Sequence, residues 1–511
     1  MIRTVRNVVR LLTIARILAR HDALFPLESL GITPFIIVSA RLISRRPEPG
    51  RPGQRLARAL HEAGPSFIKL GQALSTRSDL MGEEMTADLS ELQDSLPPFP
   101  GSQARAIIEE ELGKPIGSLF RSFDDRAVAA GSIAQVHFAE DSDGRPVAVK
   151  VLRPGVRRKF ERDLDLFLWV AKLIETARPE WRRLRPVEAV RTLAESVAFE
   201  MDLRFEASAA VELAENFADD PGFLVPAVDW GRTAQRVLTT ERVYGIPFDD
   251  REAVIAHGLD PHDVLAKAAG AFFLQVFRDG FFHGDLHAGN VFVRADGGLA
   301  FVDFGIMGRL SRRDRHHLAE LLLAFMTRDY RRAAEVHFEA GWVPSHRSVD
   351  AFTQACRSVG EPIMDKPQNE ISMAKLLGQL FYVTEAFEME TQPQLLLLQK
   401  TMLVAEGTGR RLCPDANMWL LARPLIEGWM GDMLAPNAIM RERMAEVGDS
   451  LSRFPELLRR VEHRLEMLAE HGVRLDPNSL RPAFGWTESR LQVTLLAIIA
   501  VLFLLFLLAG V

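Results

Sequence analysis

Residues 283–305 constrain the fold of this chain more than any other stretch. They read HGDLHAGNVFVRADGGLAFVDFG, in which two short apolar runs flank an ADGG turn. Such a pattern is typical of a β-hairpin. Asp285 and Asn290 precede the first run, and Asp303 follows the second. We therefore expect the hairpin to bring these three polar side chains together at one end of a β-ribbon.

Two carboxylates and an amide at this spacing suit phosphoryl transfer. Asp285 would orient or deprotonate the acceptor, and Asn290 with Asp303 would hold the Mg²⁺ that bridges the phosphates. A solvated turn aspartate is the plain alternative for each residue alone, but the combined spacing argues against it. His283 is expected to brace the loop. His283 and His287 lie in a turn without a third ligand, so a zinc site is not expected.

A second predicted hairpin, within residues 127–155, would hold the nucleotide. Lys150 lies on its returning strand, after a DSDG turn. Small residues precede the hairpin, and small side chains let backbone N–H groups approach phosphate oxygens. Alone, this pattern also fits an ordinary hairpin with a surface lysine, but the polar residues downstream favour a nucleotide site. The small residues are Ala129, Ala130, Gly131 and Ser132.

A lysine in this position needs a carboxylate on a neighbouring helix to hold it extended. A helical segment downstream supplies Glu200, Asp202 and Glu206. Glu206 is predicted to pair with Lys150, because it lies one to two turns beyond the other acids. Glu200 and Asp202 could face Lys69 or a metal ion. Each of the three also fits an ordinary solvated helix acid.

Two further segments are candidates for the same site. Lys69 and Gln72 lie one turn apart on a predicted helix, which fits either a functional pair or a solvated face. Glu241 begins residues 241–245, where a hinge between two lobes would carry the adenine against its backbone.

Both ends of the chain carry membrane signals. Residues 491–511 form an uncharged apolar stretch long enough to span a bilayer. Arg481 and Arg490 precede it, so the positive-inside rule puts the bulk of the chain in the cytoplasm. The first twenty residues carry five Arg and no acid. They suit a helix on an anionic membrane surface, a mitochondrial targeting segment or a solvated helix. On the helix, Val8, Leu11, Leu12, Ala15 and Leu18 lie mostly opposite the arginines.

Composition narrows the function classes. The net charge is −6, and the basic excess is confined to the N-terminus, so no nucleic-acid partner is expected. Cys356 and Cys413 are the two cysteines. Two are too few for a disulfide framework or a cysteine zinc site, which favours a reducing compartment.

Taken in order, these segments predict an α+β, two-lobed protein-kinase-like fold with a helical extension and a C-terminal transmembrane helix. The expected divisions are a basic membrane-surface or linker segment (1–55), the helical extension (56–115), the N-lobe (116–245), the helical C-lobe (246–440), an amphipathic helix with linker (441–490) and the membrane anchor (491–511).

From about residue 65 to residue 414 the chain resembles the UbiB family of atypical protein-kinase-like proteins. Lys69, Gly71 and Gln72 match the family's Lys-x-Gly-Gln motif, and residues 129–132 match its alanine-rich nucleotide loop. The remaining matches are Glu200 and Asp202 of a Glu-x-Asp motif with Glu206 after it, the magnesium and phosphate residues Asp285, Asn290 and Asp303, and a C-terminal helical segment that includes Lys400, Glu406 and Gly407.

The resemblance implies ATP and Mg²⁺ as cofactors, with Lys150, Asp285 and Lys69 in catalytic roles. It implies slow ATP hydrolysis rather than protein phosphorylation, since the extension would cover the cleft. The implied role is in ubiquinone biosynthesis, helping prenylated ring intermediates leave the membrane. The implied partners are membrane lipid, prenylated quinone precursors, other ubiquinone-biosynthesis proteins and a second copy of the chain as a homodimer.

Two departures and two alternatives accompany this resemblance. Gly131 stands where the family often has Ala, and one membrane segment is visible where bacterial relatives often have two. A bacterial inner membrane is favoured over a mitochondrial one, because the first twenty residues are not rich in Ser. The alternatives are a phosphotransferase for a small molecule or lipid, and a nucleotide-binding scaffold without enzymatic activity.

Overall fold

The structure, a computed structural model, describes residues 2–24, 49–75, 96–177, 186–362 and 393–416, with a few single residues between and beyond these ranges. They belong to the first of two compact units, Met1–Gly431. The predicted amphipathic segment and membrane anchor (441–511) lie outside the described residues. Among the helices that are described, none is both long and apolar enough to cross a membrane.

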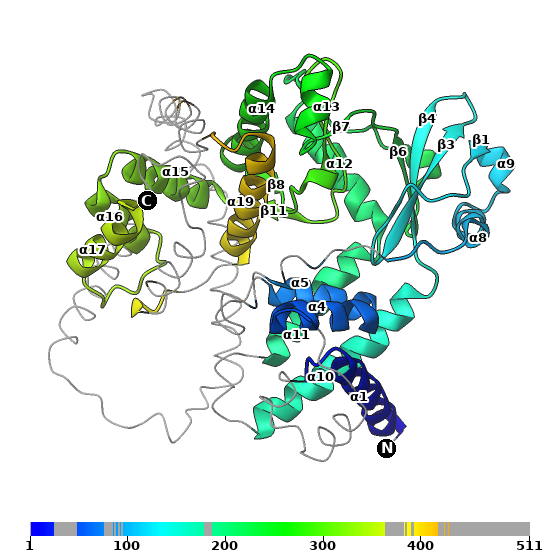
Figure 1. The fold of residues 1–511 in the computed structure, drawn as a ribbon, viewed down its shortest axis with the longest axis horizontal. Helices are drawn as coiled ribbons and strands as arrows, with labels where there is room; N and C mark the ends of the chain where they lie inside the picture. Colours follow the sequence, from blue (N-terminus) through cyan, green and yellow to red (C-terminus); the bar gives the residue numbers. More distant parts are fainter. Residues whose placement is uncertain are drawn as a thin grey trace, which may run out of the picture. The chain divides into compact units, whose positions relative to one another are not determined.

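Helices from the N-terminal segment and the extension share one apolar core with a long helix from the segment expected to form the N-lobe. Gly64 separates two of them, because its φ of +109° lies in the region that favours glycine. Pro65 then begins the next helix, where its missing N–H costs nothing. Phe67 packs edge-on against Phe167 at 5.0 Å between ring centroids. The helices are α1 (Ile2–Arg20), α4 (Pro52–Ala63), α5 (Pro65–Leu74) and α10 (Val156–Ala177) (Figure 1).

Helix α1 is packed into this core, which differs from the surface helix considered for it. Leu11 and Leu18 are buried in the shared cluster. Arg10 donates to Asp163 of α10 at 2.9 and 3.0 Å, so part of the arginine face is neutralised within the protein. Leu12, expected on the apolar face, is 46% exposed. The apolar stripe is therefore divided between the protein core and the outer surface.

The N-lobe is built on an antiparallel sheet in the order β1-β3-β4-β6, with β2 paired to β3. Helix α8 (Gly101–Leu112) covers one face of this sheet, since its Ile108 is buried in one cluster with Val149 of β4. The strands are β1 (Phe120–Phe123), β2 (Ala129–Ala130), β3 (Ala134–Asp141), β4 (Pro146–Leu152) and β6 (Val237–Glu241).

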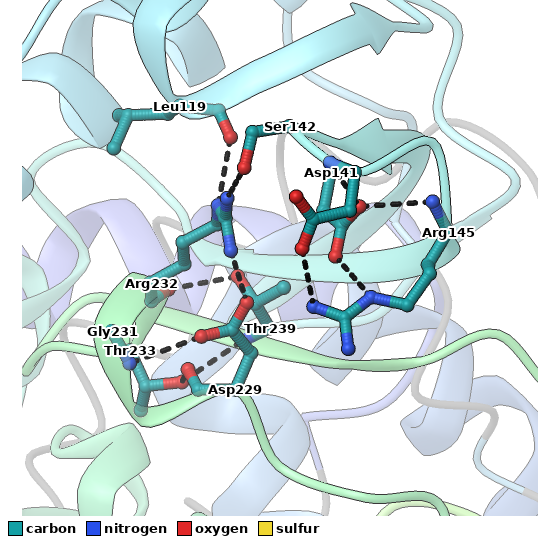
Figure 2. Close-up of polar contacts among 10 residues, drawn as sticks. Leu119, Asp141, Ser142, Arg145, Asp229, Gly231, Arg232, Thr233 and Thr239 are labelled. Atoms are coloured by element: carbon teal, nitrogen blue, oxygen red, sulfur yellow. Dashed lines mark hydrogen bonds and ion pairs between the residues drawn. The ribbon is translucent and has the colours of Figure 1, made fainter.

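The turn between β3 and β4 is held by charged side chains (Figure 2). Asp141 accepts the backbone N–H of Arg145 at 2.9 Å and its Nε at 2.8 Å. Arg232 reaches the same turn and donates to Ser142 Oγ at 2.6 Å. These contacts fix the hairpin, and the antiparallel register then sets Lys150 opposite Val136. The lysine position is thus determined by the turn chemistry.

The C-lobe is helical around small sheets. The predicted hairpin is confirmed: β9 (Val291–Val293) and β10 (Leu299–Phe301) pair antiparallel, in a four-stranded sheet with β5 (Phe223–Leu224) and β7 (Ile246–Pro247). A second pair is β8 (Phe281–His283) with β11 (Met307–Arg309). The helices are α12 (Leu203–Asn216), α13 (Arg251–Ala256), α14 (Pro261–Phe273), α15 (Arg312–Met326), α16 (Tyr330–Glu339), α17 (Val349–Gly360) and α19 (Pro393–Leu412).

A π-helical turn, Leu274–Asp279, connects α14 to residues 283–305, called the catalytic stretch below. Its wider winding sets the buried Gln275 against β8, where Gln275 Oε1 accepts the N–H of His283 at 2.9 Å. The turn ends at Gly280, whose φ is +67°. The α+β class is confirmed, and Cys356 and Cys413 are both buried and free.

Candidate active site

A cavity of about 730 Å³ gathers most of the predicted site residues. Its walls come from the extension, from the N-lobe sheet, from the catalytic stretch and from α19. Of the predicted residues, those that line it are Lys69, Ala129, Gly131, Lys150, Glu200, Asp202, Glu206, Asp285 and Asp303.

Lys150 is the centre of a three-residue ion cluster. Its Nζ lies 2.8 and 2.9 Å from the two carboxylate oxygens of Glu206 on α12, which is the expected pairing. It also lies 2.9 Å from Asp303 Oδ1, a contact the sequence did not predict. Burial alone would lower the pKa of Lys150, but the charges of Asp303 and Glu206 raise it above its usual value. Lys150 is therefore a fixed cation between two lobes.

The two carboxylates differ in environment. Burial raises the pKa of Glu206 to about 7, against the opposing effect of Lys150. Partial desolvation by the surrounding protein acts on Asp303 in the same direction, but Lys150 outweighs it and holds the Asp303 pKa below its ordinary value. Asp303 has a φ of +64°, which is uncommon for a residue other than glycine. Its side chain is half exposed and faces the cavity.

Lys69 brings the extension into the site. Its Nζ lies 2.7 Å from Glu200 Oε2 at the end of α11 (Pro186–Glu200). This is one of the two partners that the sequence left open for Glu200. Phe199 and Phe205 lie beside the pair at the wall of the cavity, with their rings edge-on at 5.1 Å.

Asp202 has a local role that the sequence did not predict. Its side chain accepts the N–H of Arg204 at 3.2 Å and caps the start of α12. The same carboxylate pairs with the Arg204 guanidinium at 2.6 and 2.9 Å. A capping aspartate satisfies N–H groups that the first helical turn leaves free. This local role explains the position of Asp202 between the two helices.

The catalytic stretch is braced by His283, as predicted. His283 is fully buried, its Nδ1 accepts the N–H of Asp285 at 3.1 Å, and its Nε2 lies 3.1 Å from the carbonyl oxygen of Val302. Burial lowers the pKa of His283. Asn290 Nδ2 donates to the backbone oxygen of Asp285 at 3.0 Å. The hairpin thus brings Asp285, Asn290 and Asp303 to one end, as expected.

Asn290 and Asp303 both carry side-chain oxygens, the donor type that suits Mg²⁺, and their ligation of the ion stays a prediction. Asn290 uses its amide N–H on Asp285, which leaves Oδ1 as an acceptor. Asp303 offers a half-exposed, ionised carboxylate. Mg²⁺ prefers oxygen ligands and is commonly bound through one or two side chains together with phosphates and water. Within the described ranges, no group of three or more His, Cys, Asp or Glu could hold a metal by itself.

Some backbone groups of the small-residue loop, residues 129–132, already form hydrogen bonds within the protein. The N–H of Gly131 donates to Ala134 at 2.8 Å, and its carbonyl accepts from Arg153 at 2.9 Å. Ser132 is fully buried, and its hydroxyl has no hydrogen-bond partner among the described atoms. Phosphate contacts by this loop remain a prediction.

Five predicted residues lie off the cavity wall: Ala130, Ser132, Gln72, Glu241 and the buried Asn290. Gln72 is half-buried on α5. Glu241 is exposed at the end of β6, and its N–H donates to Ala227 at 2.8 Å. None of residues 241–245 lines the cavity, so the adenine contact predicted for the hinge stays a prediction.

The contact between Lys400 of α19 and Asp285 was not predicted from the sequence. The Lys400 Nζ lies 3.1 Å from Asp285 Oδ1, while Gln394 and Leu397 of the same helix line the cavity. The two partners are 115 residues apart, and nothing in the lysine's own helix points to a carboxylate in a distant loop.

The chain is similar to known proteins over most of its length. Residues 91–337 match the ABC1 atypical kinase-like domain, and residues 356–417 match the UbiB helical domain. A protein named Probable protein kinase UbiB from Marinobacter nauticus is 41% identical over 472 residues, which cover 91% of this chain and 86% of that protein. The chain belongs to the UbiB family.

A second relative and a solved structure are also similar to this UbiB-family protein. A protein of the same name from Pseudomonas putida is 40% identical over 471 residues, covering 90% of this chain and 86% of the relative. The solved complex of Rv3197 with erythromycin, from Mycobacterium tuberculosis, is similar with a TM-score of 0.50 and 27% identity. That match covers 71% of this chain and 92% of the other. The match to the ABC1 kinase-like domain and this structural similarity show that the UbiB-family chain has a kinase-like fold.

Proposed function

We propose that this UbiB-family protein is a magnesium-dependent ATPase of the atypical kinase class, which supports ubiquinone biosynthesis at the inner membrane of a bacterium. The observation that carries the proposal is the cluster of Lys150, Glu206 and Asp303 in one cavity with Asp285. Kinase-like phosphoryl transfer needs a lysine held by a helix carboxylate and an aspartate at the metal. The Lys150–Glu206 pair supports the first requirement, and Asp303, within hydrogen-bonding distance of Lys150, is the candidate for the second.

Each residue has a distinct task in the proposed reaction. Lys150, held extended by Glu206, binds the α- and β-phosphates of ATP. Asn290 and Asp303 hold the Mg²⁺ ion, which supplies charge neutralisation at the phosphates when bound. Asp285 orients water, or an acceptor hydroxyl, in line with the terminal phosphate. Positioning and electrostatics then carry the catalysis.

The extension supports hydrolysis over protein phosphorylation. Lys69 and Glu200 form a buried ion pair in the wall of the cavity. A folded protein acceptor would have to displace this pair, and breaking a buried ion pair is strongly unfavourable. Water or a small acceptor meets no such cost.

The apolar part of the cavity supports a ligand with an apolar ring or chain. Its walls include Phe199, Phe205, Ile306, Met307 and Leu397. We propose that prenylated ring intermediates are the ligands, and that the protein helps extract them from the membrane. The proposal includes a membrane anchor at 491–511, the bulk of the chain on the cytoplasmic side, and partners among ubiquinone-biosynthesis proteins or a second copy of the chain.

The test is magnesium-dependent ATP hydrolysis by the full chain, in detergent and in anionic liposomes, with and without a phenol that mimics a ubiquinone precursor. We expect turnover that lipid or phenol raises and that Asp303→Asn abolishes. Nucleotide binding without turnover in the wild type would instead identify a scaffold. Transfer of labelled phosphate to the phenol or lipid would identify a phosphotransferase, an alternative that Asp285 at the cavity wall favours.

A further inference from the structure

We propose that Lys400 is a positioning residue for Asp285, so that α19 of the helical domain takes part in turnover through one ion pair. This inference rests on the proposed function, because it concerns the aspartate that orients water or acceptor. Lys400 Nζ lies 3.1 Å from Asp285 Oδ1, and the two side chains are 28% and 31% exposed.

Several groups hydrogen-bond the backbone of Asp285, but none of them hydrogen-bonds its carboxylate. His283 accepts its N–H at 3.1 Å, and its carbonyl accepts from Asn290 Nδ2 at 3.0 Å and from the N–H of His287 at 2.9 Å. His287 Nε2 is 3.8 Å from Asp285 Oδ2, too far for a hydrogen bond. Within the described part of the chain, Lys400 is thus the side chain that hydrogen-bonds the carboxylate.

Helix α19 is anchored independently of Lys400. Leu398, Thr401 and Leu412 are buried, and Arg251 donates to the carbonyl of Leu412. The helix also packs closely on the catalytic stretch, since a side chain at Gly284 would lie 3.1 Å from Leu397 Cδ1. A fixed helix carries Lys400 to a fixed point, which is what a positioning residue requires.

The negative charge of the bound phosphates explains why the Asp285 carboxylate needs a cation beside it. Asp285 lines the cavity in which the phosphates would lie. An unpaired carboxylate would repel the terminal phosphate and turn away from it. Lys400 offsets that repulsion and restricts the rotamer, while the phosphates themselves are bound by other groups. Removing Lys400 should therefore lower kcat more than it raises KM for ATP.

The experiment compares Lys400→Met and Lys400→Arg in the full chain. We expect Lys400→Met to lower kcat about 100-fold, the scale of a misplaced catalytic group, with KM for ATP nearly unchanged. Lys400→Arg should recover most of the rate, because it keeps the charge. Arg411→Met is the matched control. It removes the ion pair between Arg411 of α19 and Asp249, and neither of these residues lines the cavity. It should leave kcat unchanged.

A second readout does not depend on turnover. Hydrogen–deuterium exchange of residues 283–290 should rise in Lys400→Met and stay at the wild-type level in Lys400→Arg and Arg411→Met. Unchanged exchange in Lys400→Met, or a wild-type kcat in that variant, overturns the positioning role. If the wild type hydrolyses no ATP, the proposed function fails, and exchange alone then decides whether Lys400 fixes the loop.

Discussion

Lys69 of α5 and Glu200 of α11 form an ion pair in which both side chains are only 9% exposed. Each charge has lost most of its water, so each depends on the other for stability. The pair joins residues 131 positions apart and ties the N-terminal extension to the cavity wall.

Breaking this pair should destabilise the protein. Lys69→Met or Glu200→Gln is expected to lower the free energy of unfolding by about 3 kcal/mol, because each removes one charge of a buried ion pair. The double variant should cost clearly less than the sum of the two. Urea denaturation of all four proteins measures this, and strict additivity would mean that the two side chains do not interact.

Alanine substitutions at two glycines should have opposite effects on the free energy of unfolding. A Cβ at Gly308 would lie 2.1 Å from the Phe282 ring, so Gly308→Ala should lower stability by about 1–3 kcal/mol through overpacking. A Cβ at Gly407 of α19 meets nothing within 4 Å, so Gly407→Ala should raise stability by about 1 kcal/mol through helix propensity. Thermal unfolding distinguishes them. Equal shifts would contradict the packing described here.

His337 of α16 gives the protein a defined acid sensitivity. Burial lowers its pKa to about 4, although Nδ1 donates to the carbonyl of Ala333 at 2.7 Å. The unfolded chain therefore takes up a proton first as the pH falls from 6.5 to 4, and stability is lost in that window. The loss should reach about 3 kcal/mol at 1.36 kcal/mol per pKa unit.

The variant His337→Phe isolates this contribution, since a ring at this position still packs against Phe352. Its unfolding free energy should fall less than that of the wild type between pH 6.5 and pH 4. Parallel pH profiles for the two proteins would assign the acid sensitivity to other groups.

Cys356 should resist alkylation in the folded protein. Burial raises the pKa of its thiol to about 12, and the thiolate is the reactive form. We expect iodoacetamide at pH 8 to leave Cys356 unmodified until urea is added, as measured by mass spectrometry. Rapid labelling of the native protein would show that helix α17 opens readily. Cys413, also buried, is the internal comparison.

Local sequence patterns predicted the parts of the site that depend on neighbouring residues. The ADGG turn determines the β9–β10 pairing, and that pairing sets Asn290 and Asp303 at one end. Lys150 and Glu206 were also predictable, because a strand lysine in this setting requires a helix carboxylate.

Contacts between distant segments were not predictable in the same way. Lys400 meets Asp285 only because α19 packs on Gly284. Arg6 and Arg10 of α1 pair with aspartates of α10, a helix that basic composition alone does not suggest as a partner. The capping role of Asp202 was not predicted, because it depends on the backbone position of Arg204 at the start of α12.

The π-helical turn at Leu274–Asp279 restricts which insertions and deletions this chain can tolerate. Loss of one residue there would restore ordinary α-helical winding and rotate Gln275 by about 100°. Gln275 would then leave the N–H of His283, and the loop that carries Asp285 would lose its brace. Changes of length should therefore be accepted in the surface turns around this segment and rejected within it.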